Sequence, residues 1–273
     1  MEDQLTFQWD QPMVRESPVE GSVTTEVSVC MATYRGRDFV AEQVHSILAQ
    51  LGPDDELVVV DDASPDGTVL VLTALADRDQ RIRLHTRTSN HGYVRTFEEA
   101  LGLAKGRLLL LADQDDVWLP GRVEEMRRAL RDVDVVATNL TTLGGPDGIR
   151  GPYGQPDWVL RHVDSTRYVR NIVGILAGNR PYYGCAMGLR RAALDTVLPI
   201  PSWMRESHDL WLALYGNVFG SITHLPIRTV ARRLHGENQT PNRPRDPLTV
   251  IRSRLRLLRC LGILLGRRLS SRL

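Results

Sequence analysis

From residue 27 onward, short apolar runs alternate with segments whose apolar residues recur at helical spacing. The apolar runs predict strands at 27–33, 56–62, 82–86, 108–111 and 133–138. The segments between them predict helices at 39–51, 68–76, 93–104 and 119–130. Strands that alternate with helices in this way form βαβ units, so we expect an α/β fold with a mostly parallel central sheet flanked by helices.

The second half of the chain has a less regular pattern. Glycine and proline predict a long loop at 141–155, and helical spacing predicts a helix at 163–176. We further expect a strand running into a helix at 182–194, a short helix at 207–215, a strand pair at 222–233 and a basic, leucine-rich helix at 248–265. This last helix would be a C-terminal extension of the α/β fold.

Polar residues follow several of the predicted strands. In a parallel sheet, ligands bind at the carboxyl ends of the strands, so this placement indicates a binding site. The residues concerned are Thr33, Tyr34, Arg35, Asp61, Asp62, Asn90, His91, Gly92, Asp113, Asp115 and Asp116.

Three carboxylates directly follow the leucine run at 108–111. Two negative charges about 5 Å apart repel by roughly 3 kcal/mol at an effective dielectric of about 20, and no lysine or arginine lies within five residues of Asp115. Mg²⁺ or Mn²⁺ would offset this repulsion, because both ions favour carboxylate oxygens. The alternative is helix capping. With Pro120 in the first turn of the helix predicted from residue 119, capping would account for Asp116 alone.

Composition narrows the class of protein. The 273 residues include 34 lysines and arginines and 33 aspartates and glutamates. The chain therefore lacks the excess of positive charge that is typical of nucleic-acid-binding proteins. Three scattered cysteines form no disulfide framework and suggest a reducing compartment. Residues 1–25 lack the basic start and apolar core of a signal peptide, so we expect a loosely ordered acidic tail. No apolar run reaches the ~20 residues of a membrane span, and these features together predict a cytoplasmic protein.

Seven ordered motifs between residues 26 and 240 resemble family 2 glycosyltransferases of the GT-A fold, in particular the rhamnosyltransferase-like branch. The motifs are VSVCMATYRGRDFV, VVVDDASPDGT, NHGYVRTFEEAL, ADQDDVWLP, GCAMGLRRA, SHDLWLAL and RLHGENQT. The resemblance implies a donor-binding half at 26–140 and an acceptor-binding half with the catalytic base at 141–240. Residues 241–273 follow as a basic amphipathic helix.

The resemblance also implies roles for individual residues. Asp115 would be the main metal ligand, joined by His235, and Asp209 would be the general base. The nucleotide and donor sugar would contact Thr33, Tyr34, Arg35, Asp61, Asp62, Gly92, Arg95, Asp113, Asp116 and Arg233. The acceptor side would include Gly184, Cys185, Trp118 and His208.

The implied reaction is inverting sugar transfer from a dTDP- or UDP-sugar, with rhamnose as one candidate, to a hydroxyl of a glycan, lipid-linked saccharide or small molecule. A metal would stabilise the leaving diphosphate, and one carboxylate base would activate the acceptor. Alternatives from the residues alone stay open. Asp209 could cap its helix, His208 could orient Asp209 or only pack, and Trp118 could belong to the core.

Two other functions remain open: an inactive nucleotide-sugar-binding protein of the same fold, and a sugar nucleotidyltransferase. The second usually has a glycine-rich loop after the first strand, where this chain has only Gly36. The basic C-terminal helix could lie on the inner face of a membrane as a peripheral contact, dock on the core, or join two copies in a homodimer.

Overall fold

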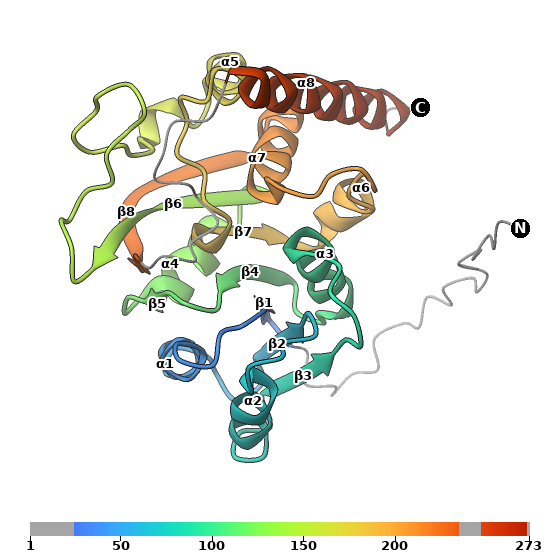
Figure 1. Ribbon diagram of the computed structural model, residues 1–273. Helices are drawn as coiled ribbons and strands as arrows, with labels where there is room; N and C mark the ends of the chain where they lie inside the picture. The colour runs from blue at the N-terminus through green and yellow to red at the C-terminus, as the bar shows by residue number, and fades with distance from the viewer. Residues whose placement is uncertain (1–24, 235–246, 272–273) are drawn as a thin grey trace, which may run out of the picture.

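The computed structural model describes residues 25–234 and 247–271, and within them eight strands form one mixed sheet in the order β3-β2-β1-β4-β7-β6-β8-β5 (Figure 1). The strands are β1 (Val27–Thr33), β2 (Glu56–Asp61), β3 (Ile82–Thr86), β4 (Leu108–Asp113), β5 (Val117–Trp118), β6 (Val135–Leu143), β7 (Met187–Arg190) and β8 (Ile222–Arg233). Strands β3, β2, β1 and β4 run parallel, and β7 is antiparallel to both its neighbours. The predicted mostly parallel α/β fold is confirmed.

Helices cover both faces of this sheet. They are α1 (Val40–Leu48), α2 (Thr68–Ala76), α3 (Tyr93–Leu103), α4 (Arg122–Ala129), α5 (Tyr168–Ala177), α6 (Leu194–Val197), α7 (His208–Phe219) and α8 (Pro247–Ser270). Successive strand residues point to opposite faces. Val29 and Met31 therefore pack with α1, α2 and α4, whereas Cys30 and Ala32 pack with α3 and α7.

The second half differs from the sequence prediction in two places. The predicted strand pair at 222–233 is wrong, because β8 is a single strand alongside β6. Its pairing shifts between His224 and Arg228, where Pro226 lies in a bulge and needs no ladder hydrogen bond. The predicted loop at 141–155 starts too early, since β6 continues to Leu143 by pairing with the end of β8.

The helix predicted from residue 119 begins instead at Arg122, after Gly121 in a left-handed conformation. Val117 and Trp118 form β5, which pairs antiparallel with Ala231 and Val230 of β8. This long-range pairing keeps the chain extended where the local pattern predicted a helix. The capping role considered for Asp116 is therefore wrong, because this residue lies five positions before the N-cap Gly121 and makes no capping bond.

The C-terminal helix α8 is longer than predicted and packs on α7 through Leu257, Cys260 and Leu264, which are almost fully buried. Figure 1 shows it in red along the upper edge of the molecule, across α7 from the sheet. No helix in the described part of the chain is both long enough and apolar enough to span a bilayer.

Candidate active site

The carboxyl ends of three parallel strands bring the predicted polar residues to one edge of the sheet. Thr33 pairs in register with Asp61, and Ala32 pairs with Asp113. The first two side chains are directly bonded, because the Thr33 hydroxyl donates to Asp61 over 2.8 Å. Side chains of β1, β2 and β4 therefore meet where the strand-end pattern placed them.

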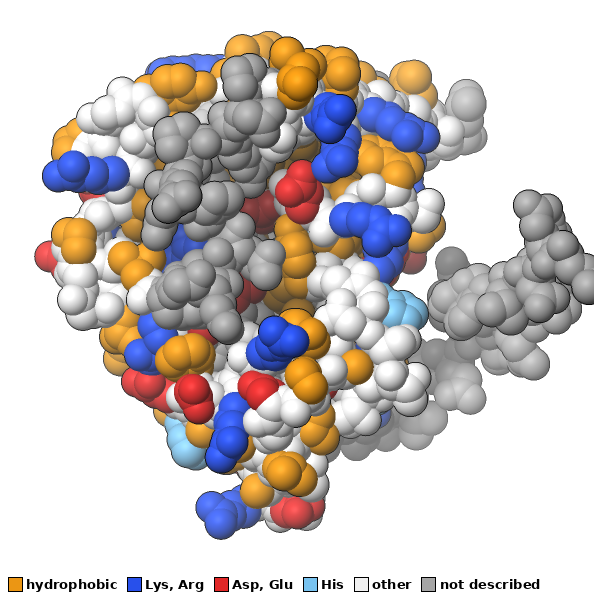
Figure 2. All heavy atoms as spheres, in the orientation of Figure 1, with side chains coloured by type: hydrophobic (Ala, Val, Ile, Leu, Met, Phe, Trp, Pro, Cys, Tyr) orange, Lys and Arg blue, Asp and Glu red, His pale blue; other side chains and the backbone are white. Residues whose placement is uncertain are grey.

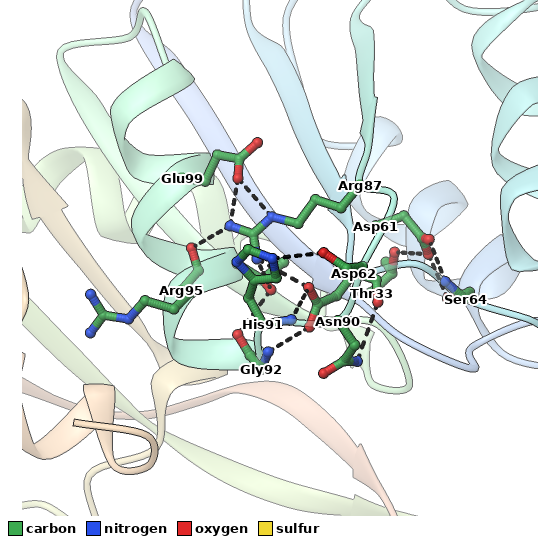
Figure 3. A network of polar contacts seen from close by, with 12 residues as sticks. Thr33, Asp61, Asp62, Ser64, Arg87, Asn90, His91, Gly92, Arg95 and Glu99 are labelled. Carbon is green, nitrogen blue, oxygen red and sulfur yellow. Dashed lines mark hydrogen bonds and ion pairs between the residues drawn. The ribbon is translucent and has the colours of Figure 1, made fainter. Parts of the chain in front are cut away.

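Asp61 is fully buried and holds the turn that follows β2 (Figure 3). The backbone amide of Ser64 donates to Asp61 Oδ1 over 2.8 Å, and the Ser64 hydroxyl donates to Oδ2 over 2.6 Å. Together with Thr33, these donors fix the carboxylate in place. Any contact of Asp61 with a nucleoside would have to use the remaining lone pairs of a carboxylate that already organises the loop.

Asp62 fixes the loop between β3 and α3 (Figure 3). Its Oδ1 accepts from the Arg87 guanidinium over 3.0 Å and from the His91 amide over 2.9 Å, and its Oδ2 accepts from the Gly92 amide over 2.7 Å. Gly92 has a φ of 85°, which favours glycine at this position. Arg87, which the sequence analysis missed, also pairs with Glu99. The side chain of Asp62 therefore shapes this loop.

The segment after β1 is tied to the aspartate segment by Gln114. Its side-chain amide exchanges two 2.8 Å hydrogen bonds with the backbone of Tyr34. A Cβ on Gly36 would lie 2.3 Å from the Gln114 oxygen, so only glycine fits there without a shift. The Tyr34 ring is 38% exposed at this edge, with the Arg35 guanidinium 5.2 Å from its centroid. An exposed aromatic ring here is suited to stacking on a nucleobase.

Two predicted site residues have other contacts. The Arg95 guanidinium donates to the backbone carbonyls of Ile200, Pro201 and Met204 and pairs with Glu98, so we leave it out of the donor site. Trp118 is 3% exposed and belongs to the hydrophobic core, which favours the core alternative over an acceptor contact.

The carboxylate cluster lies after β4. Ligand atoms of Asp113, Asp116 and Cys185 are all within 4.8 Å of one another. Burial and the neighbouring negative charges raise the pKa of Asp113 above its usual range and that of Asp116 to about 6. Asp115 contributes to both shifts, although its carboxylate is outside this group of three.

The donor set of this cluster fits a divalent cation. Oδ2 of Asp116 is buried and has no hydrogen-bond partner within residues 25–234 and 247–271. Burial and the neighbouring aspartates raise the pKa of Cys185 well above its usual range, so this residue is a protonated thiol. The effective ligands are therefore two carboxylates, the type that Mg²⁺ and Mn²⁺ accept. Asp115 as the main ligand remains a prediction, and His235 lies outside the described residues.

Two arginines at the end of β8 supply the positive charge that the local sequence lacks. Pairing of β5 with β8 places Arg233 beside the aspartates, where its amide donates to Asp116 Oδ1 over 3.3 Å and its Nε to the Asp115 carbonyl over 3.1 Å. The charge of Arg232 acts to lower the pKa of Asp113, Asp116 and Asp209. The sequence analysis missed Arg232, although it directly precedes the predicted Arg233.

A third arginine that the sequence analysis missed lies behind the cluster. Arg122 is fully buried and donates to the carbonyl of Cys185 over 2.7 Å and to the hydroxyl of Thr229. Its guanidinium also lies 4.5 Å from the centroid of the Trp118 ring. Arg122 therefore joins α4 to β8 and to the segment that carries Cys185, beneath the carboxylates.

Asp209 lies in the first turn of α7. Burial raises its pKa to about 6, the Glu206 charge adds to this effect, and Arg232 opposes it. Its Oδ1 accepts from the adjacent Leu210 amide over 2.8 Å. Asp209 is the second residue of the helix rather than its N-cap, and the N-cap residue Ser207 makes no side-chain cap bond. The pKa of Asp209 is thus closer to neutral pH than that of an ordinary carboxyl group, and the charge of Asp209 contributes to the raised pKa of Asp113.

His208 packs rather than orients Asp209. Its ring stacks on Phe97 with centroids 4.3 Å apart, and neither ring nitrogen has a hydrogen-bond partner in the described chain. Burial lowers its pKa to about 4, so the ring is neutral. A Cβ on Gly184 would lie 2.5 Å from His208 Nε2, which explains glycine at that predicted acceptor-side position.

Comparison with known proteins shows the family to which the chain belongs. The family model described as "Glycosyl transferase family 2" matches residues 28–198, which is more than half of the chain. The chain belongs to glycosyl transferase family 2. Within this family, the glycosyltransferase TuaG of Bacillus subtilis (strain 168) is 36% identical over 99 residues, 36% of this chain and 39% of TuaG.

Another relative is the Escherichia coli protein named UDP-Glc:alpha-D-GlcNAc-diphosphoundecaprenol beta-1,3-glucosyltransferase WfgD. It is 32% identical over 98 residues, 36% of this chain and 38% of WfgD. The crystal structure of S. aureus TarS 1-349 in complex with UDP-GlcNAc matches with a TM-score of 0.64 at 18% identity, over 90% of this chain and 73% of that one. This family 2 chain thus has the fold of TarS, and its matches span about two fifths of TuaG and WfgD.

Proposed function

We propose that this family 2 chain transfers a sugar from a UDP- or dTDP-sugar to an acceptor hydroxyl, with inversion of configuration. The UDP-GlcNAc bound to TarS and the UDP-Glc in the name of WfgD support a nucleoside-diphosphate donor. The donor half would be 26–140, and the acceptor half 141–240. Rhamnose rests only on the motif resemblance, since neither TuaG nor WfgD is named a rhamnosyltransferase.

The observation that carries the proposal is the position of three carboxylates around one arginine. Arg232 acts to lower the pKa of Asp113, Asp116 and Asp209, so its charge is within reach of the cluster after β4 and of the first turn of α7. Sugar transfer needs positive charge at the leaving diphosphate and a base near the acceptor oxygen. In this proposal Arg232 would supply the positive charge and Asp209 the base.

In this proposal Asp115 would be the main ligand of Mn²⁺ or Mg²⁺, Asp113 and Asp116 would also hold the ion, and the ion would stabilise the charge that develops on the leaving diphosphate. Arg232 adds fixed positive charge beside the same carboxylates. The exposed Tyr34 ring would stack on the nucleobase.

Asp209 would accept the proton of the acceptor hydroxyl. A pKa of about 6 suits a base that is ionised at neutral pH yet retains affinity for a proton. With one base and no second nucleophile, the acceptor oxygen attacks the sugar from the side opposite the diphosphate, so configuration inverts. Gly184 and Cys185 would line the acceptor side. The WfgD name makes a saccharide on a lipid diphosphate one acceptor class to try.

A thermal-shift panel of nucleoside diphosphates, with and without Mn²⁺, tests the donor site. A ligand present at 100 times its Kd raises the free energy of unfolding by ~2.7 kcal/mol. Each kcal/mol raises Tm by roughly 2–4 °C in a domain of this size, so we expect Tm to rise by about 5–10 °C. Asp116→Asn should abolish the part that depends on Mn²⁺. The donor-site proposal fails if no nucleotide stabilises the wild-type chain in a metal-dependent way. Binding without turnover would favour the inactive binding protein.

A further inference from the structure

The outer face of α8 carries a long apolar stripe, which is interrupted at Gly262. Its members are three or four residues apart, except that seven residues separate Leu258 from Leu265, and their side chains are 46–67% exposed. They are Leu248, Ile251, Leu255, Leu258, Leu265 and Leu269. From the first to the last, the stripe is about 32 Å long at ~1.5 Å per residue. So long an exposed apolar stripe on one helix indicates an interaction surface.

The charges beside this stripe have one sign. Helix α8 contains six arginines and no aspartate or glutamate. Arg252 and Arg259 follow the stripe on one side, and Arg254 and Arg268 on the other, as helical spacing dictates. Figure 2 shows basic and hydrophobic side chains mixed along the upper edge of the molecule, where α8 runs in Figure 1. The surface therefore suits a partner that is apolar at its centre and negatively charged around it.

The same arginines oppose a homodimer through this stripe. Spacings of three and four residues are those of a coiled-coil seam, in which flanking residues of the two helices face each other. Two copies of α8 would bring arginine against arginine at those flanking positions, and like charges there disfavour pairing. Charge complementarity thus favours an anionic partner over a second copy.

We propose that the outer face of α8 binds the surface of a bilayer that contains anionic lipids, with the helix in the plane of the interface. Leucine side chains would enter the boundary between headgroups and acyl chains, and the arginines beside them would contact lipid phosphates. The opposite face of α8 stays on α7 through Leu257, Cys260 and Leu264. The folded chain would thus bind as a peripheral unit.

Contacts from α8 reach the segment that leads to Asp209. Arg256 pairs with Glu206 over 2.9 Å, and the Arg259 guanidinium lies 4.5 Å from the centroid of the Trp203 ring. A bilayer bound to α8 would therefore lie near the base, where an acceptor hydroxyl carried by a lipid could reach it. This consequence rests on the proposed function, whereas membrane binding itself does not.

Cosedimentation with vesicles tests the proposal. The full chain should bind vesicles of phosphatidylcholine with phosphatidylglycerol, should bind pure phosphatidylcholine weakly, and should lose binding as salt rises. The triple variant Ile251→Gln, Leu255→Gln, Leu258→Gln should bind at least about tenfold more weakly, because its apolar stripe is interrupted. Leu70→Gln is the matched control: this leucine is 75% exposed on α2, at the opposite end of the molecule, and should bind as wild type.

Folding and the donor site are checked separately, since the triple variant should keep the wild-type Tm and its nucleotide-dependent shift. The membrane proposal is overturned if the triple variant binds anionic vesicles as well as wild type, or if wild type binds none. Self-association that the triple variant loses, without vesicle binding, would instead make the stripe an interface between copies. A missing nucleotide shift in wild type would overturn the proposed function alone.

Discussion

The pH dependence of turnover tests the environment of Asp209. Burial raises its pKa to about 6, and a base must be ionised to accept a proton. The ionised fraction is then about 9% at pH 5 and about 91% at pH 7, so kcat should rise roughly tenfold between them. At the usual carboxyl pKa of about 3.8, the same interval would change kcat by less than about 10%.

The assay is release of nucleoside diphosphate at saturating donor and Mn²⁺. If Asp113 and Asp116 hold the ion as proposed, these conditions would keep their carboxylates occupied, so their own titration should not enter the profile. Asp209→Asn is the control, because its residual rate should not follow the same titration. A wild-type rate that is flat from pH 5 to pH 7.5 would refute the reasoning that burial tunes Asp209 as a base.

Three further substitutions probe the charges around the site. Arg232→Ala should move the midpoint of the kcat profile above about 6, because it removes the positive charge that lowers the pKa of Asp209; an unchanged midpoint would contradict this. Arg122→Met should lower the free energy of unfolding, measured with urea, by about 3 kcal/mol, because it leaves the buried Cys185 carbonyl without its hydrogen-bond donor. Asp62→Asn should lower the free energy of unfolding by about 2 kcal/mol in the same measurement, because it weakens the charged hydrogen bonds that Asp62 makes to the loop after β3.

The local pattern of the sequence was sufficient for several elements in the first half of the chain. Strands β1 and β3 and helix α2 have the predicted bounds, because each has a periodicity that its own residues set. The carboxylates gather at one edge because parallel strands in register end together. The strand-end pattern therefore predicted that these carboxylates lie at one edge of the sheet.

The partners of those carboxylates could not be predicted from local sequence. Arg232 reaches the site through pairing of β8 with β5 and β6, in which Val117 pairs with Ala231 and Thr142 with Arg232, residues 114 and 90 positions apart in the sequence. The pairing of β5 with β8 keeps the chain extended, so α4 begins only at Arg122. No periodic pattern in the sequence predicts that Arg122 is buried beneath the carboxylates. The arginines near these carboxylates are brought there by pairing between distant strands. The sequence around Asp115, which contains no lysine or arginine, does not reveal them.

The loss of turnover in Asp209→Asn, with nucleotide binding retained, tests the central claim most directly. We predict that nucleoside diphosphate release falls at least about 100-fold, as expected for removal of a general base. The Mn²⁺-dependent thermal shift should stay at the wild-type value, because Asp209 lies on α7, outside the carboxylate group after β4. Release within about tenfold of the wild-type rate, with binding intact, would contradict the assignment of Asp209 as the base.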